Sequence, residues 1–421
     1  MEASHGSGPA ATPGSEHTLE QLVRGGLVAT HFSPVVDLQS DTVIGHRVYH
    51  GVAGVPPEPA HFTAFRRAVR ESEHVADLDA SLRSLALREA EQLRLPRTNR
   101  LFMTAEPQAL GTVEDRTAEP DRSAILQLHP DRIAQAPAMT LRSVRQARTL
   151  GWGIGMAEIG DDLRTTSFLP LVNPSVVMLR PSVLAIEDHV HLAELIRLLQ
   201  AHVERTDAIL VADGVTTEED LLKAEALGAR FGTGPWFGEP SQEPEAADPG
   251  ETDVLADHHT RNQLAQGTPF TIAQGRERDP LVMDGEMLTA QLHSLAERSL
   301  AAGESAVVIS VFADAEELSP ETLARFESVA DSVGYTVMLS AGFDTPPVPA
   351  ARGGQIDTSD PLQAEFCVIV IGPDWSGLTV GKRRFSPGPD GRTEYDVHVT
   401  TERYACVDAA RSVFTRIRTL H

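Results

Sequence analysis

The regular alternation of short apolar segments with helical segments constrains the fold of this chain more than any other feature. The apolar segments RLFMTA, AILQLH, SVVML and AILVADGV alternate with segments of helical periodicity at residues 139–151, 189–206 and 217–228. Strands joined through helices lie parallel in one sheet, because the helix returns the chain to the edge where the first strand began. The alternation extends over about 220 residues and predicts a parallel α/β architecture, with a closed barrel favoured.

The ends of the predicted strands are where functional side chains are expected, because parallel barrels place their sites at the C-terminal ends of strands. One such end is GHRVYHG at residues 45–51, which follows a predicted strand, turn and second strand beginning near Phe32. It brings an arginine, two histidines and a tyrosine to an inward-facing strand end. The segment is either a cationic active site or a site whose chemistry has been removed.

The composition changes after Pro240 and divides the chain into parts. Residues 1–17 are predicted to be a disordered tail, and residues 18–240 to form the barrel. Residues 241–267 are acidic and rich in proline, which is typical of a linker. Residues 268–421 again alternate strand and helix segments, and they predict a second, smaller α/β domain.

The charge balance limits the classes of partner. The chain has 36 basic and 60 acidic residues, and its net charge of -24 repels nucleic acids and anionic membranes. The segment GKRR at residues 381–384 is the one local basic cluster. No apolar segment approaches the roughly 18 residues that a membrane helix needs, and the N-terminus lacks a secretory signal pattern. We therefore expect a cytoplasmic protein without a nucleic-acid or membrane partner.

Cysteine and histidine usage argues against a metal site built on these residues. The two cysteines, Cys367 and Cys406, form neither a disulfide scaffold nor a zinc-ligand pattern, and both are predicted to be inert, reduced thiols. His31, His46 and His50 lie close together, but their spacing fits no strong ligand pattern. They are predicted to be surface or barrel-mouth residues.

Three segments carry a resemblance to a known family. They are FSPVVDLQSDTVIGHRV, GIGMAEIGDDLRTTSFLPLVNPSVVMLRP and VADGVTTEEDLLKAEALGARFGTGPWFGEP, and in the last one several glycines, Phe237 and Pro240 are in register. Residues 20–240 thereby resemble the EAL domain, the bacterial phosphodiesterase that linearises cyclic di-GMP on a barrel with two divalent metals. The resemblance implies a TIM-like barrel with its site at the barrel mouth.

The metal-binding positions of that family are mostly replaced in this chain. The family uses carboxylates and an asparagine to hold two cations, which activate a water. The motif glutamate falls on Arg47, and only Glu158 and Asp213 keep a carboxylate. The resemblance implies a vestigial site, with no metal and no cofactor, at Arg47, Thr104, Gln127, Ala157, Glu158, Met178, Asp213 and Thr233. Three further motif positions fall on Pro130, Arg180 and Thr216.

The second domain carries a different resemblance. Its segments TPFTIAQGRERD, VVISVFADAEELSPETLARFESVA and DPLQAEFCVIVIGPDWSG lie within residues 268–377. They resemble the DICT domain, a small sensory module that commonly accompanies cyclic di-GMP domains. The resemblance implies sensing or protein interaction.

Together these features predict a non-catalytic bacterial signalling protein, a pseudo-phosphodiesterase that acts on a regulatory protein partner. Two alternatives stay open: a cyclic di-GMP receptor without hydrolysis, and a residual cyclic di-GMP phosphodiesterase. Against the receptor, Gly51 stands at the position of a family arginine, and Ser33 at that of a glutamine. By resemblance alone, a homodimer through the barrel is expected.

Arg47 leads to a specific structural expectation. Acidic side chains left behind by a lost metal site still need a counter-charge, and a guanidinium can make two parallel hydrogen bonds to a carboxylate. We therefore expect Arg47 to point into the barrel mouth and to pair with Glu158, Asp213 or both. The alternative is that Arg47 points to solvent.

Overall fold

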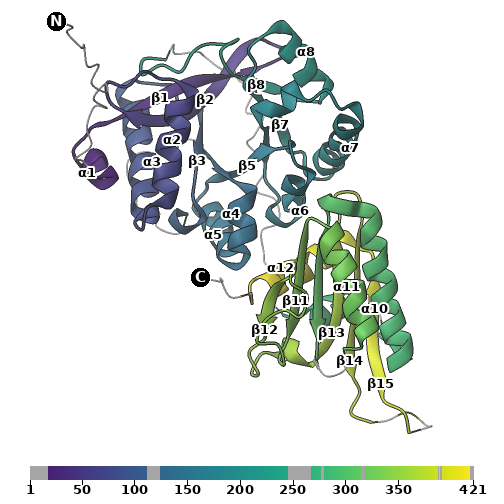
Figure 1. Cartoon of the computed structure of the whole chain (residues 1–421). Coiled ribbons are helices and arrows are strands. Elements are labelled where there is room, and N and C mark those ends of the chain that lie inside the picture. Colours follow the sequence, from purple (N-terminus) through teal and green to yellow (C-terminus); the bar gives the residue numbers. More distant parts are fainter. Residues whose placement is uncertain are drawn as a thin grey trace, which may run out of the picture.

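The computed structural model describes residues 18–110, 124–244, 267–275, 279–313, 318–386, 388 and 391–417. The predicted tail at 1–17 and most of the predicted linker, residues 245–266, lie outside the described residues. Two domains follow one another along the chain, and both are α/β (Figure 1). Within the described residues, no helix has the length and apolar character needed to cross a membrane.

The first domain is a closed barrel of eight strands (Figure 1). Strand β1 runs antiparallel to both β2 and β8, and the remaining neighbours are parallel, so the predicted barrel is confirmed. The strands are β1 (Val28–Asp37), β2 (Thr42–Val52), β3 (Arg100–Thr104), β4 (Ala124–Leu128), β5 (Gly153–Ile159), β6 (Val176–Leu179), β7 (Ile209–Asp213) and β8 (Phe231–Thr233). Apolar side chains such as Val35, Phe102 and Phe231 form one core cluster inside the barrel.

Helices surround the barrel on the outside. They are α1 (Leu19–Arg24), α2 (Pro59–Glu71), α3 (Val75–Gln92), α4 (Pro130–Gln135), α5 (Pro137–Thr149), α6 (Leu169–Val172), α7 (His189–Thr206) and α8 (Glu218–Ala226). The boundaries of α7 coincide with the segment predicted from the sequence, and Asp188 caps its first turn by accepting from the Val190 amide. The sequence analysis did not identify α2 or α3.

The second domain is a seven-stranded sheet in the order β12-β11-β10-β13-β14-β15-β9. Its strands are β9 (Leu281–Asp284), β10 (Val307–Phe312), β11 (Tyr335–Ser340), β12 (Arg352–Gln355), β13 (Glu365–Ile371), β14 (Ser376–Arg383) and β15 (Glu394–Thr400), and its helices are α9 (Pro269–Gln274), α10 (Gly285–Ser299), α11 (Pro320–Ser332) and α12 (Arg403–Phe414). Leucines of α10 and Phe326 of α11 pack on one face of the sheet. Helix α12 contacts β13 and β14. Cys367 and Cys406 are buried, and burial raises the pKa of both thiols.

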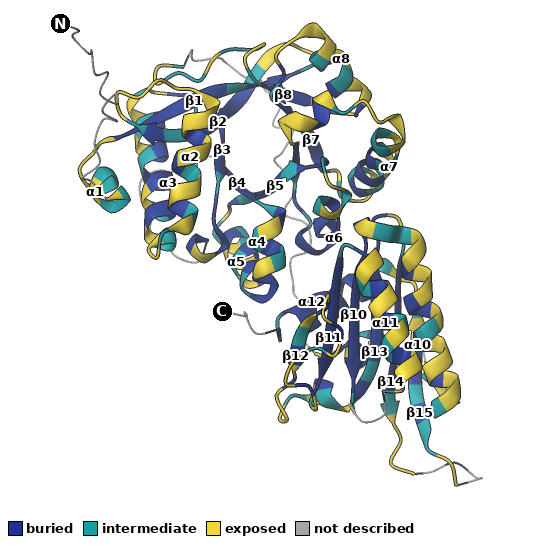
Figure 2. Cartoon of the chain, in the orientation of Figure 1, coloured by how far each residue is buried: buried dark blue, intermediate teal, exposed yellow. Residues whose placement is uncertain are grey.

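Helix α12 joins the two domains, because it also contacts α5 and α6 of the barrel. Phe414 at its end lies against Phe168 of the barrel and Tyr335 of β11, in one core cluster that includes residues of both domains. Arg411 donates from Nε to the Leu171 carbonyl at 2.9 Å. Figure 2 shows α10 and α11 exposed along their outer sides, whereas α12 lies between the sheet and the barrel.

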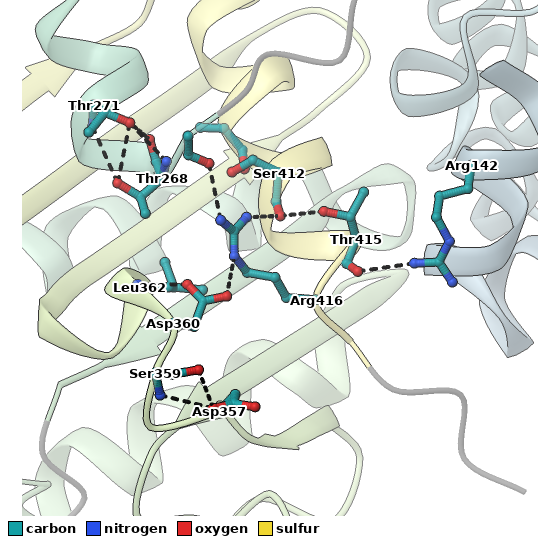
Figure 3. Close-up of polar contacts among 12 residues, drawn as sticks. Arg142, Thr268, Thr271, Asp357, Ser359, Asp360, Leu362, Ser412, Thr415 and Arg416 are labelled. Carbon is teal, nitrogen blue, oxygen red and sulfur yellow. Dashed lines mark hydrogen bonds and ion pairs between the residues drawn. The ribbon is translucent and has the colours of Figure 1, made fainter.

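Polar contacts at the C-terminal end of α12 fix this helix further (Figure 3). Arg416 donates from Nε to Asp360 at 2.7 Å and from Nη2 to the Gly267 carbonyl at 3.3 Å. Arg142 on α5 donates to the Thr415 carbonyl at 3.2 Å. Cationic groups at this end of a helix also interact favourably with its dipole.

Candidate functional site: the barrel mouth

The C-terminal strand ends bring the predicted site positions to one end of the barrel. The strand register pairs Ser33 with Arg47, Thr104 with Gln127, and Asp213 with Thr233. Arg47, Gln127, Ala157, Met178, Asp213 and Thr233 are buried there, while Thr104 and Glu158 are half-buried. The positions that the sequence analysis grouped are therefore close neighbours around the barrel, on consecutive strands.

Arg47 points into the barrel and forms an ion pair with Asp213 through Nη1. The two side chains are 11% and 8% exposed, so the pair is largely screened from water. Burial is the largest single effect on Arg47 and lowers its pKa, but the charge and hydrogen bond of Asp213, together with smaller contributions from Tyr49 and Glu158, outweigh it. The pKa of Arg47 therefore lies above its ordinary value. The expectation that Arg47 pairs with a leftover carboxylate is confirmed for Asp213.

Tyr49 holds the Arg47 guanidinium on its other side. The guanidinium carbon lies 4.9 Å from the centre of the Tyr49 ring, within range of a cation–π interaction. The Tyr49 ring in turn stacks on Phe62 of α2, with ring centres 4.9 Å apart. Burial raises the pKa of Tyr49, so this phenol stays neutral. Arg47 is therefore fixed by packing as well as by charge.

Glu158 is not a partner of Arg47 in the described contacts; it pairs with Arg180 at 2.9 Å. The same guanidinium binds Asp161 at 2.5 Å, so it joins an acidic side chain at the end of β5 to one in the segment that follows. Glu158 has φ of 62°, a left-handed conformation that is uncommon for glutamate. Asp162 is the N-cap of the 3₁₀ helix Leu163–Thr166, and its side chain accepts from the Arg164 amide.

The remaining positions of the mouth are neutral. Ser33 and Thr233 face one another, with their hydroxyl oxygens 3.4 Å apart. Gln127 donates from Nε2 to the Met178 sulfur at 3.2 Å, and its Oε1 atom is buried without a hydrogen-bond partner. These groups offer no anionic ligands for a hard divalent cation, which prefers carboxylate oxygens.

A cluster of arginines and carboxylates beside the mouth was missed by the sequence analysis. Glu106, just after β3, accepts from Arg66 at 2.9 Å and from Arg70 at 3.0 Å, and it lies 3.3 Å from Arg132. Arg66 also donates to Asp79 at 2.6 Å. Arg66 and Arg70 are four residues apart on α2, a spacing that indicates a shared helix face once that helix is recognised.

The three neighbouring histidines are structural and not surface residues, which corrects one of the two readings offered from the sequence. His31 and His46 are buried on β1 and β2. Burial, with a contribution from Arg66, lowers the pKa of His50 to about 4. Among the described residues, no group of three or more histidine, cysteine, aspartate or glutamate side chains is placed to hold a metal ion.

The fold is a TIM-like barrel with its candidate site at the C-terminal ends of the strands. Residues 16–240 match the family model of the EAL domain, and the chain belongs to this family, which acts in cyclic di-GMP signalling. A search of curated proteins finds no match.

The barrel is similar to many solved structures, among them the following three. The EAL enzyme Bd1971, in its cAMP- and cyclic-di-GMP-bound form, is 19% identical with a TM-score of 0.46, and the match covers 53% of this chain and 64% of Bd1971. The FimX EAL domain of Xanthomonas citri in complex with c-diGMP is 14% identical over 54% of this chain and 94% of that one, with a TM-score of 0.46. An EAL domain protein from Listeria monocytogenes is 15% identical over 55% and 96%, with a TM-score of 0.45. This chain thus spans less than two thirds of Bd1971.

The residues at the mouth do not fit the two divalent metals that the family resemblance implies. A pair of such ions needs several carboxylates that are free to coordinate. Asp213 is paired with Arg47, and Glu158 is paired with Arg180. Arg47 also brings a positive charge to the position of a motif carboxylate, and this charge repels a cation.

Proposed function

We propose that this chain is a non-catalytic member of the EAL family, a pseudo-phosphodiesterase that regulates cyclic di-GMP signalling through a protein partner. The observation that supports this proposal best is the buried Arg47–Asp213 ion pair at the barrel mouth. A fixed side-chain cation stands where the family's catalytic site binds a metal.

The ion pair resists replacement by a metal. Binding of a divalent ion to Asp213 requires Arg47 to leave, and Arg47 also contacts the ring of Tyr49. Removing one partner of a buried pair typically costs about 3–5 kcal/mol, because the other charge is left uncompensated. Since few other carboxylates are free at the mouth, metal binding recovers little of that energy.

Product formation from cyclic di-GMP tests the proposal. The full chain is incubated with cyclic di-GMP and either Mg²⁺ or Mn²⁺, and the linear product is measured by chromatography. We expect no turnover above the protein-free control. Metal-dependent turnover that is abolished by Asp213→Asn would show that the chain is a phosphodiesterase.

Calorimetric titration with cyclic di-GMP tests the receptor alternative. The Ser33 hydroxyl faces Thr233 inside the barrel, and Gly51 offers no side chain to a phosphate group. We therefore expect no binding at micromolar concentrations. Micromolar or tighter binding without turnover would favour a receptor over a protein that acts through interaction alone.

The second domain, residues 268–421, is proposed to be a DICT-like sensory module. Its seven-stranded sheet and its direct contacts with α5 and α6 would let a change in one domain reach the other. The homodimer expected from resemblance would have to use another barrel face, because α12 covers part of the α5–α6 face. Separate ligand screens of wild-type protein and a Phe414→Ala variant, by thermal shift, test for such transmission.

A further inference from the structure

Strand β9 leaves one edge of the second-domain sheet open. It is the last strand in the sheet order, and β15 is its one neighbour among the described strands. Leu281 and Val282 on this strand are 54% and 51% exposed, and Met287 just beyond it is also exposed. An open strand edge with exposed apolar side chains is a template for adding another strand.

The opposite edge of the same sheet is protected. Strand β12 contains Gly353 and Gly354, which have φ values of 119° and 127°. Such values depart from regular strand geometry. Although β12 keeps an even register with β11 on its inner side, this geometry makes its outer side less suited to a further strand. A short stretch around Thr345 also lies beside Gly354. The contrast shows that β9 is the edge of this sheet at which regular pairing can continue.

A groove adjoins the end of β9. It has a volume of about 520 Å³ and lies between the start of α10 and the β14–β15 hairpin. Its walls include apolar and acidic side chains, with one arginine on the hairpin side: Asp284, Glu286, Leu288, Phe366, Arg392 and Tyr395. The groove begins beside Asp284 at the end of β9 and extends along α10 toward Phe366 of β13.

The charges around β9 favour a basic occupant. The register pairs β9 with residues Glu394 to Val397 of β15, and these two paired segments contain three carboxylates, at Asp284, Glu394 and Asp396, and no basic residue. Glu286 in the first turn of α10 is also acidic. Arg384 contacts Glu394 and Asp396, and Lys382 of β14 lies opposite Asp396 in the register, so Asp284 and Glu286 are the carboxylates that remain for an occupant. A second copy of the chain, with its net charge of -24, would bring like charges to this edge.

We propose that β9 binds an extended segment of a partner protein, which adds a strand to the sheet and alternates apolar residues with lysine or arginine. Main-chain hydrogen bonds to β9 would hold the segment, and an apolar side chain would enter the adjoining groove. Its basic residues would face Asp284 and Glu286. This inference rests on the proposed function, since it names the surface through which a non-catalytic protein would act.

Selection from a displayed library of random octapeptides on the immobilised full chain tests the inference. Enriched peptides are synthesised, and their affinities are measured by fluorescence anisotropy against wild-type protein, Val282→Lys and Leu281→Lys. The matched control is Val190→Lys, which changes an exposed valine on α7 of the barrel. Because all three positions are exposed, the variants should fold, and thermal melts check this.

We expect alternating apolar and basic peptides whose affinity falls at least tenfold with Val282→Lys and is unchanged with Val190→Lys. Their binding should also weaken with salt, because exposed charges are screened. The inference is overturned if no peptide distinguishes wild type from both edge variants, or if the enriched peptides are acidic. It is also overturned if wild-type protein sediments as a dimer that Val282→Lys dissociates, since a second copy then occupies the edge.

The peptide-binding results can be distinguished from a failure of the proposed function. Such a failure appears as metal-dependent hydrolysis of cyclic di-GMP by wild-type protein. Edge variants, which lie in the other domain from Asp213, should leave that hydrolysis unchanged. A chain without hydrolysis and without edge-dependent peptide binding would retain the proposed function and lose only this surface.

Discussion

Arg47 shows how a single side chain can take the electrostatic place of bound metal. Its guanidinium is held by Asp213 on one side and by the Tyr49 ring on the other. The same arrangement recurs beside it, where Arg180 joins Glu158 and Asp161. Arginines from β2 and from the residue after β6 thereby balance the carboxylates at the mouth. The counter-charge comes from the protein's own side chains.

Replacing Arg47 should destabilise the barrel. We expect Arg47→Ala to lower the free energy of unfolding by about 3–5 kcal/mol, because it leaves Asp213 buried without a partner. Arg180→Ala is the matched control; its side chain is 44% exposed, so we expect about 0–1 kcal/mol. Urea denaturation measures both changes, and equal values for the two variants would contradict the assignment. Arg47→Ala should not restore Mn²⁺ binding in a titration.

Buried histidines should make the barrel sensitive to acid. The pKa values of His50 and His202 are lowered to about 4, first by burial. Because the folded-state values lie below the unfolded value of about 6.5, the unfolded chain binds more protons between pH 6.5 and 4, and stability falls as the pH decreases through that range.

The measurement is the free energy of unfolding at pH 7 and at pH 5. We expect the difference between these two values to shrink in His50→Gln relative to wild type. Thr63→Ser, a change at an exposed position of α2, serves as the control. An unchanged pH dependence in His50→Gln would show that the pKa of this histidine is the same in the folded and the unfolded protein.

At the scale of the helices and strands, the sequence predicted best those elements that bury one clear face. The α7 segment has apolar spacing and an aspartate cap, and its predicted boundaries match the structure. Helices α2 and α3 were missed, although Phe62, Phe65 and Val69 of α2 are buried at helical spacing. Strands β9 and β12 were also missed, since they are short edge strands and β12 carries two glycines.

The positions of the site residues could be predicted from the sequence by alignment, but the contacts between their side chains could not be predicted. Whether Arg47 pairs with Asp213 or with Glu158 depends on the backbone at the end of β5, where Glu158 has a left-handed conformation and pairs with Arg180. The Glu106 cluster depends on the packing of α2 against the loop after β3, which no local pattern specifies.

Phe414 at the end of helix α12 should contribute strongly to the stability of the contact between the two domains. Phe414 is fully buried between Phe168 and Tyr335, and we expect Phe414→Ala to lower the free energy of unfolding by about 3–5 kcal/mol. Tyr404→Ala, on the exposed side of the same helix, should change it by less than about 0.5 kcal/mol. Urea denaturation followed by tryptophan fluorescence measures both. A small loss for Phe414→Ala would mean that the two domains are joined more loosely than their contacts indicate.

At the scale of the whole molecule, the two domains should unfold together. One core cluster includes side chains of both, and the interface adds the Arg411 bond to Leu171 and an ion pair between Arg164 and Glu304 at 2.8 Å. We expect one transition in differential scanning calorimetry of the full chain, with a calorimetric enthalpy equal to the van't Hoff enthalpy. Two resolved transitions would show that the domains are thermodynamically independent.

Because α12 is synthesised after the barrel, the barrel surface that it covers is made before its cover. This helix is C-terminal to every other described element, yet it covers the apolar surface of α5 and α6. A ribosome therefore finishes the barrel sequence well before the segment that shields its flank has been made. Until then, the nascent barrel presents Phe168 without its partner Phe414, and transiently exposed apolar surface of this kind is what chaperones recognise. Premature termination before residue 403 would leave the apolar surface of α5 and α6 exposed. Cellular quality control would have to remove such a product.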